Sequence, residues 1–263
     1  MKRRIGIVFV CLTLMVSTVG FSVAVTNDTI YVDDDGTADY TSIQAAINAA
    51  SDGDTIYVFS GAYNEHIVID AKSITLEGED KDTTIINANN ENRVVEVKNT
   101  DGFILKGFTL QNSATGWLEA GITLIGSMNC EITDNVIQMN DYGIVLHTSE
   151  AISVSLNDII QNNVGLYSTG TKNCGITRNN IQDNSINGVE LENSKSDSIT
   201  ENNFIDNKKD LSFNGIFSTE IDANYWDQQL NPYFKTHIGF LFSLIPIPGF
   251  IIDWHPADEP YGI

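Results

Sequence analysis

The sequence predicts an all-β protein: a single-stranded, right-handed parallel β-helix with coils of about 22 residues. The first observation is an asparagine that recurs at steps of 22, 22, 23 and 22 residues, at Asn135, Asn157, Asn179, Asn202 and Asn224. The second is a pair of columns with the same steps: Asn140, Asn162, Asn184 and Asn207, and Ile132, Val154, Ile176, Ile199 and Ile221. A fixed period of this length is typical of solenoids.

The third observation is that the repeats favour strands rather than helices. Segments such as Gly143-Ile-Val-Leu alternate over a few residues and are broken by Asn, Asp and Gly, which are turn residues. Three short strands and three turns consume about 22 residues, one coil of a parallel β-helix. Asparagines at one turn would then stack on each other, each amide bonding the next.

Residues 1–25 are predicted to be a signal peptide or an N-terminal anchor. Lys2, Arg3 and Arg4 precede an uncharged stretch over residues 5–25, which is the pattern of an export signal. At about 21 residues the stretch is also long enough to remain as a membrane tether. We therefore expect an exported protein, secreted or held at the cell surface.

The charge of the chain limits its partners. A net charge of −21 disfavours nucleic acid and anionic membranes. It is compatible with calcium, and Asp33, Asp34 and Asp35 form an acidic cluster, but an acidic solvated surface and an ordinary acidic turn explain both features. No sequence motif supports a metal site or another cofactor.

Residues 26–60 are predicted to form an N-terminal cap and the first strands. A short helix is expected over residues 41–50, where Thr41 or Ser42 can serve as N-cap. Its apolar stripe consists of Ile43, Ala46, Ile47 and Ala50. Such a helix suits the open end of a β-helix, where the core and unpaired edge groups would otherwise meet water.

Residues 61–227 are predicted to form the β-helix repeats. The sequence also resembles known families. Four runs are similar to the start of pectin-esterase and pectate-lyase-like β-helix proteins: residues 39–50, 53–58, 61–65 and 74–78. The later coils, with Asn224-Tyr-Trp-Asp, resemble the NosD-like (PbH1) repeats of prokaryotic surface and periplasmic proteins. Together the resemblances cover most of residues 30–227 and imply the fold.

The resemblance implies less about activity. The esterase's catalytic aspartates belong to a motif resembling Asp-Phe-Ile-Phe, which is absent from this sequence, so the esterase reaction is not expected. NosD-like proteins are associated with copper. The histidines of this chain form no close metal-ligand pair in sequence: His66, His147, His237 and His255.

Two cysteines test the coil assignment. Cys130, Ile152 and Cys174 occupy equivalent positions in successive coils, so about 9.5 Å separates the two thiols. A disulfide needs Cα atoms within about 7 Å. We therefore expect both cysteines to be unpaired and buried.

A candidate ligand site follows from one inserted loop. The gap from Asn112 to Gly121 is six residues longer than the gap from Asn140 to Gly143, and insertions in solenoids often build the binding face. We expect the loop to overhang the outward face of the next strands. The candidate residues are Trp117, Glu119, His147, Tyr167, Glu190 and Glu192.

Aromatic rings beside carboxylates suit a sugar, because CH groups stack on the ring and carboxylates accept hydrogen bonds from hydroxyls. The alternative is that Trp117 folds back over its own loop. Glu190 and Glu192 lie on one side of a strand with backbones roughly 6.6 Å apart, which meets the carboxyl spacing of inverting glycosidases. Any two carboxylates at positions i and i+2 of a strand have this spacing, so no residue is predicted to be catalytic.

Residues 228–263 are predicted to form a C-terminal cap and tail. The apolar run over 238–252 contains Pro246, Pro248 and Gly249, which oppose a membrane-spanning helix. We expect it to cover the last coil, although an exposed docking or membrane-contacting loop is the alternative.

The sequence therefore predicts a non-catalytic, exported β-helix protein of the cell surface or periplasm that binds polysaccharide or cell-envelope glycan, or contributes to envelope structure. The alternatives are a polysaccharide lyase or glycoside hydrolase acting near Trp117, and a NosD-like copper accessory protein.

Overall fold

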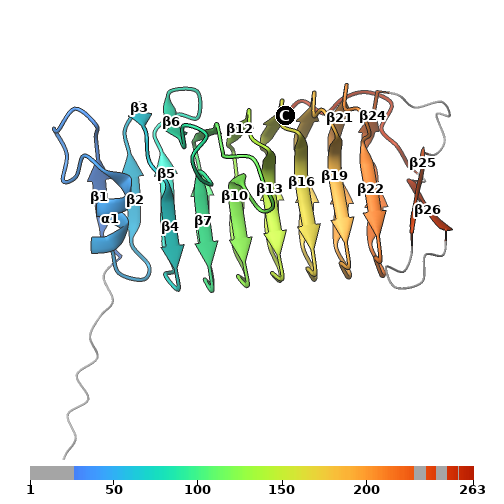
Figure 1. The fold of residues 1–263 in the computed structure, drawn as a ribbon, viewed down its shortest axis with the longest axis horizontal. Helices are drawn as coiled ribbons and strands as arrows, with labels where there is room; N and C mark the ends of the chain where they lie inside the picture. Colours follow the sequence, from blue (N-terminus) through green and yellow to red (C-terminus); the bar gives the residue numbers. More distant parts are fainter. Residues whose placement is uncertain (1–26, 228–234, 241–247, 254) are drawn as a thin grey trace, which may run out of the picture.

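The computed structural model describes residues 27–227, 235–240, 248–253 and 255–263. Over this range the chain forms a parallel β-solenoid with three sheets, and successive coils lie side by side along its long axis (Figure 1). The predicted fold class is confirmed. The predicted signal or anchor segment, residues 1–25, lies outside the described residues. No helix within the described ranges is long and apolar enough to span a membrane.

Sheet 1 has nine strands in the described residues. They are β1 (Thr29–Val32), β2 (Thr55–Val58), β5 (Thr75–Gly78), β8 (Ile104–Lys106), β11 (Glu131–Thr133), β14 (Ser153–Ser155), β17 (Gly175–Thr177), β20 (Ser198–Thr200) and β23 (Glu220–Asp222). Sheet 2 consists of β3 (Gly61–Tyr63), β6 (Thr84–Asn87), β9 (Thr109–Gln111), β12 (Val136–Gln138), β15 (Asp158–Ile160), β18 (Asn180–Gln182), β21 (Asn203–Ile205) and β24 (Tyr225–Trp226).

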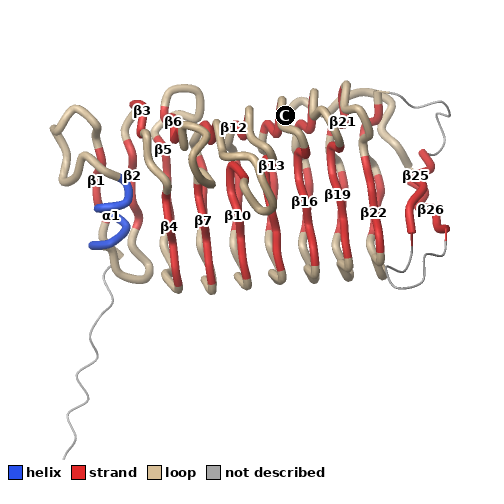
Figure 2. The backbone as a smooth tube through the Cα atoms, in the orientation of Figure 1, coloured by secondary structure: helices blue, strands red, loops and turns tan. Residues whose placement is uncertain are grey.

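Sheet 3 carries the longer strands and faces the viewer in Figure 2. It consists of β4 (Ile67–Asp70), β7 (Val95–Lys98), β10 (Ala120–Ile125), β13 (Tyr142–His147), β16 (Val164–Thr169), β19 (Asn187–Glu192), β22 (Leu211–Asn214), β25 (Lys235–Phe240) and β26 (Pro248–Asp253). The last two strands pair antiparallel, and the others in this sheet pair parallel. Residues 228–234, 241–247 and 254 of the predicted C-terminal cap lie outside the described residues.

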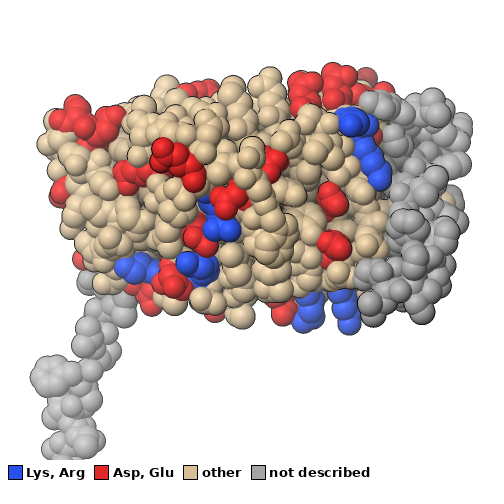
Figure 3. All heavy atoms as spheres, in the orientation of Figure 1, with Lys and Arg blue, Asp and Glu red and all other residues tan. Residues whose placement is uncertain are grey.

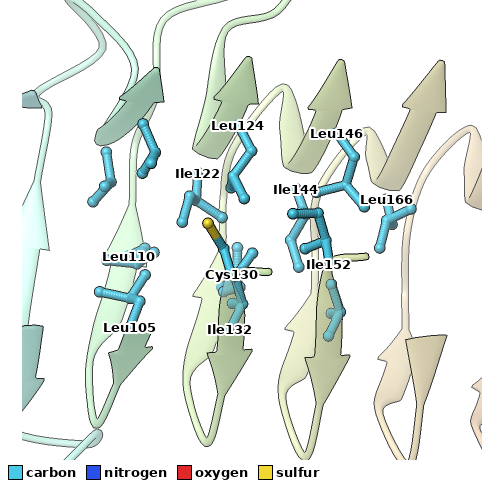
Figure 4. Close-up of a cluster of buried hydrophobic side chains, with 14 of the residues drawn as sticks. Leu105, Leu110, Ile122, Leu124, Cys130, Ile132, Ile144, Leu146, Ile152 and Leu166 are labelled. Carbon is cyan, nitrogen blue, oxygen red and sulfur yellow. The ribbon is translucent and has the colours of Figure 1, made fainter. Parts of the chain in front are cut away.

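The core runs along the inside of the coils. Alternate residues of each strand point inward, so aliphatic side chains from successive coils stack in columns (Figure 4). Ile122, Ile144 and Leu166 form one such column in sheet 3, and all three are fully buried. Cys130 and Cys174 are free and buried, as predicted, and burial raises the pKa of the Cys174 thiol to about 11.

Asparagine ladders hold the turns together. Asn135 donates a side-chain hydrogen bond to Asn157 (3.0 Å), and Asn157 donates to Asn179 (3.0 Å). The ladder continues through Asn202 and Asn224, and a second ladder links Asn140, Asn162, Asn184 and Asn207. The predicted stacking is confirmed. Each amide satisfies polar groups of two coils inside a dry turn, where unpaired groups would be costly.

Asp253 ends the first ladder. Its carboxylate is fully buried and accepts hydrogen bonds from the backbone N–H groups of Ala223 and Asn224 (3.2 and 3.0 Å). It also accepts one from the indole N–H of Trp226 (3.0 Å), whose ring stacks on Phe204. This last residue of β26 thus occupies the place that an asparagine of a further coil would take.

Helix α1 (Ile43–Ala49) covers the N-terminal end (Figure 1). Ser42 is its N-cap, as the sequence allowed, and Glu65 accepts the N–H groups of Ile43 and Gln44. The side chain of Gln44 bonds both the N–H and the C=O of Val68 in β4, the first strand of sheet 3. The helix therefore occupies hydrogen-bonding groups of an otherwise unpaired strand edge.

One buried carboxyl predicts a pH dependence of stability. Asp197 is 1% exposed and accepts hydrogen bonds from the N–H of Cys174 (2.9 Å) and the hydroxyl of Thr171 (2.7 Å). Burial raises the pKa of Asp197 above its ordinary value, although both hydrogen bonds act in the opposite direction. The folded protein therefore holds this proton more tightly than the unfolded chain does. Stability is lost as pH rises from the ordinary carboxyl pKa through the raised one.

We expect Asp197→Asn to melt higher than the wild type at pH 7, by roughly 2–4 °C, the shift that about 1 kcal/mol gives in a chain of this size. At pH 3, where the carboxyl is protonated in both states, the two proteins should melt together. Thermal denaturation followed by circular dichroism at both pH values measures this. A difference that does not change with pH would contradict the expectation.

Candidate functional site

The inserted loop between β9 and β10 packs onto the outward face of sheet 3. Leu118 is 5% exposed and forms a second apolar cluster with Ala120, Val145, Val164 and Tyr167, separate from the main core. Thr123 is fully buried on this face and donates a hydrogen bond to the carbonyl of Leu118 (2.9 Å). The outward face is therefore not an open strand surface here, because the loop covers part of it.

Polar contacts fix the loop at both ends. The N–H of Gly116 donates to Asp141 (2.8 Å), and Arg93 Nε donates to the carbonyl of Leu118 (2.8 Å). The same guanidinium lies 3.7 Å from Glu119 and 3.3 Å from Glu96. Arg93 thus connects the loop to the start of β7, and the Glu119 carboxylate forms an ion pair with its guanidinium group.

Trp117 projects from the anchored loop. Its side chain is 66% exposed, the most of the large apolar residues in the described chain. The indole contacts His147 of β13 edge-on, with ring centroids 5.7 Å apart. The His147 Nδ1 atom is buried and has no hydrogen-bond partner within the described residues. The loop therefore holds an exposed aromatic ring beside the imidazole of His147.

Tyr167 is placed differently from the expected open surface. It is only 9% exposed, lies under the loop cluster and packs against Tyr142 with ring centroids 5.6 Å apart. Its hydroxyl donates to Glu192 Oε2 (2.5 Å). Burial first, and then the bond to Glu192, raise the pKa of Tyr167 well above its usual range, so the phenol stays a donor. Tyr167 positions Glu192 rather than offering a ring face.

Glu190 and Glu192 lie on β19, two strands from His147 and so about 10 Å across the sheet. Glu190 accepts a hydrogen bond from the side chain of Asn187 (2.8 Å). Figure 3 shows two acidic spots over β19 and a cluster of mixed charge over β7 and β10, with an uncharged surface between them. The structure thus brings Trp117 to His147 and Tyr167 to Glu192, and it pairs Glu119 with Arg93 instead.

Two residues of this face were not predicted from the sequence. Arg93 and Glu96 belong to the coil before the insertion, where the step to the next strand is 27 residues instead of 22. The alternation of Val95-Glu-Val-Lys98 indicated outward charges. Nothing in the sequence showed that Arg93 would meet the backbone of the loop.

These features define the class of the protein: a parallel β-helix on which an inserted loop between β9 and β10 presents side chains on the outward face of a sheet. Residues 47–239 match the family model described as "Periplasmic copper-binding protein (NosD)". This match spans more than half of the chain, and the chain belongs to the NosD family. The comparison with curated proteins returns no match. The predicted export agrees with the periplasmic location in the family's description.

Solved structures share the fold at low identity. Pectin methylesterase from carrot superposes with a TM-score of 0.53 and 16% identity, over 78% of this chain and 75% of that one. The catalytic domain of a GH87 α-1,3-glucanase, in complex with tetrasaccharides, superposes with a TM-score of 0.51 and 11% identity, over 72% of this chain and 47% of that one. Both results confirm the β-helix fold predicted from the sequence.

The described residues offer no matching donor set for the copper that the family's description names. In the described part of the chain, no three His, Cys, Asp or Glu residues are grouped to hold a metal ion. His66 bonds the carbonyl of Arg93, His147 packs on Trp117 and His255 contacts Asp222. The side chain of His237 lies outside the described residues.

Proposed function

We propose that this protein is an exported, non-catalytic β-helix protein that binds a polysaccharide or cell-envelope glycan on the outward face of sheet 3. The observation that carries the proposal is the 66% exposure of Trp117 on a loop that Leu118 and Arg93 anchor. Exposing an indole costs apolar burial, and a fixed, exposed ring is a ready platform for the CH groups of a sugar.

The surroundings of Trp117 support an extended neutral ligand. The imidazole of His147 on β13 packs beside Trp117, and Glu190 and Glu192 offer carboxylate acceptors about 10 Å away on β19. A chain of several sugars spans such a face better than a single sugar. The two carboxylates disfavour a polyanionic glycan by like-charge repulsion. Two proteins of the same fold, by their names, act on pectin and α-1,3-glucan, which supports a carbohydrate ligand by analogy.

Binding of the protein to a glycan array tests the proposal. We expect Trp117→Ala to weaken binding of the selected glycan roughly 5- to 30-fold, because losing a stacked ring removes about 1–2 kcal/mol. Phe217→Ala is the matched control, since Phe217 is also an exposed aromatic residue (48%) but follows β22 outside this face. Unchanged binding in Trp117→Ala would place the ligand elsewhere.

The same assay separates binding from catalysis. The proposal requires that the bound glycan is recovered without new reducing ends or unsaturated sugars. Product formation that disappears in Glu190→Gln or Glu192→Gln would instead establish a lyase or hydrolase.

A second candidate function rests on the family's description, which names copper. Copper that remains with the protein at one equivalent after dialysis would favour a role in metal handling.

A further inference from the structure

A hollow at the N-terminal end of the solenoid lies apart from the Trp117 face, on the outward side of sheet 1. Its lining residues are Tyr31, Asp33, Thr37, Ala38, Asp39 and Phe59. One wall is the outward side of β1 and the end of β2, and the other is the loop that connects β1 to α1 (Figure 1). The proposed glycan site uses none of these residues.

The first wall is aromatic. Tyr31 is 44% exposed, and its ring lies nearly parallel to that of Phe59, with centroids 6.1 Å apart and planes at 23°. Tyr57, the register partner of Tyr31, packs edge-on against both rings, at 6.0 Å and 5.3 Å. The three rings therefore hold each other in place. The hydroxyl groups of Tyr31 and Tyr57 bond to no described residue, so ligand contact would break no internal hydrogen bond.

The second wall is acidic. Asp33 accepts the hydroxyl hydrogen bond of Thr37 (2.9 Å), and Asp39 accepts the N–H of Tyr31 (3.0 Å). These bonds fix both carboxylates beside the rings. None of the lining residues is Lys, Arg or His. Burial, followed by the charges of Glu79 and Glu77, raises the pKa of Tyr57, so two further carboxylates act on the ring cluster.

We propose that this hollow binds a small organic cation of the quaternary or tertiary ammonium class. The faces of aromatic rings attract cations through their quadrupole, and methyl groups on nitrogen bury apolar surface against the same rings. Two carboxylates without a basic neighbour supply the complementary charge. A metal ion fits less well, because Tyr31 and Phe59 form the wall opposite the carboxylates, where further oxygen ligands would be needed. A neutral sugar would gain nothing from the two negative charges.

Isothermal titration calorimetry of the full chain with tetramethylammonium, beside the uncharged isostere tert-butanol, tests the proposal. We expect heat of binding with the cation only, and binding that weakens as sodium chloride is added. Tyr31→Leu should weaken binding roughly fivefold, the loss of one cation–π contact. Tyr31→Phe, which keeps the ring, should bind as the wild type does.

Asp39→Asn is a second, independent variant. Its side-chain oxygen can still accept the N–H of Tyr31, so the loop is retained while one negative charge is removed. We expect roughly fivefold weaker binding of tetramethylammonium here as well. Trp117→Ala should leave it unchanged, which separates this site from the proposed glycan site. Equal binding of tert-butanol, binding of cellobiose in place of the cation, or binding unaffected by both Tyr31→Leu and Asp39→Asn would overturn the proposal.

Discussion

Asn157→Ala should lower the free energy of unfolding by about 3–5 kcal/mol. The Asn157 amide is fully buried, and its oxygen accepts hydrogen bonds from the N–H and the side chain of Asn135. Its nitrogen donates to the carbonyls of Ile132 and Ser155 and to Asn179. Alanine leaves several of these groups unpaired in a dry turn, and each unpaired group costs about 1–3 kcal/mol.

Asn163→Ala is the matched control for this change. Asn163 is exposed, and its side chain bonds only Asp141 and Ser185, both at the surface. Its replacement should change the free energy of unfolding by no more than about 0.5 kcal/mol. Urea denaturation of the two variants beside the wild type measures the difference. If both substitutions cost the same, the ladder does not stabilise the solenoid in the way described.

Gly143→Ala should also destabilise strongly, by about 3 kcal/mol. A Cβ atom at Gly143 would lie 2.4 Å from the carbonyl oxygen of Gly165 and 3.0 Å from the Nδ2 atom of Asn162. The first contact is with the backbone of the next coil, which cannot move without disturbing the parallel pairing of β13 and β16. Overpacking of this kind typically costs 1–3 kcal/mol, and a backbone clash belongs at the upper end of that range.

Gly175→Ala tests whether the cost comes from the clash. Gly175 is also a strand glycine, in β17, but a Cβ atom there would meet only the hydroxyl of Ser198 at 3.6 Å. We expect this variant to melt at or slightly above the wild-type temperature, because alanine restricts the unfolded chain more than glycine does. A comparable loss of stability in the two variants would show that the close approach at Gly143 is relieved at little cost.

The fold could be predicted because the repeat acts locally and in register. The Asn135 column predicted stacked turns, and the structure places each member in hydrogen-bonding contact with the next. The spacing of Cys130 and Cys174 likewise predicted free thiols. Both inferences needed only the period and the strand spacing, since a parallel solenoid puts equivalent residues of successive coils directly beside each other.

The candidate site could be predicted only in part. The sequence located the insertion and the strands beside it, but it could not show that Leu118 would bury Tyr167 and leave Trp117 exposed. That outcome depends on how one irregular loop packs on a face, and no period governs such packing. Asp253 was missed for the same reason, because it enters the asparagine ladder from outside the repeat.

The sequence by itself thus determined the coil, its period, the identity of the stacked columns and the place of the insertion. The tertiary structure alone decided which outward side chains stay accessible, how Arg93 holds the loop, and why glycine stands at residue 143. The physical reason is that register repeats along the chain and can be read from spacing. Contacts across the solenoid surface depend on how loops and side chains of different coils pack together. The spacing of the repeat along the sequence does not determine that packing.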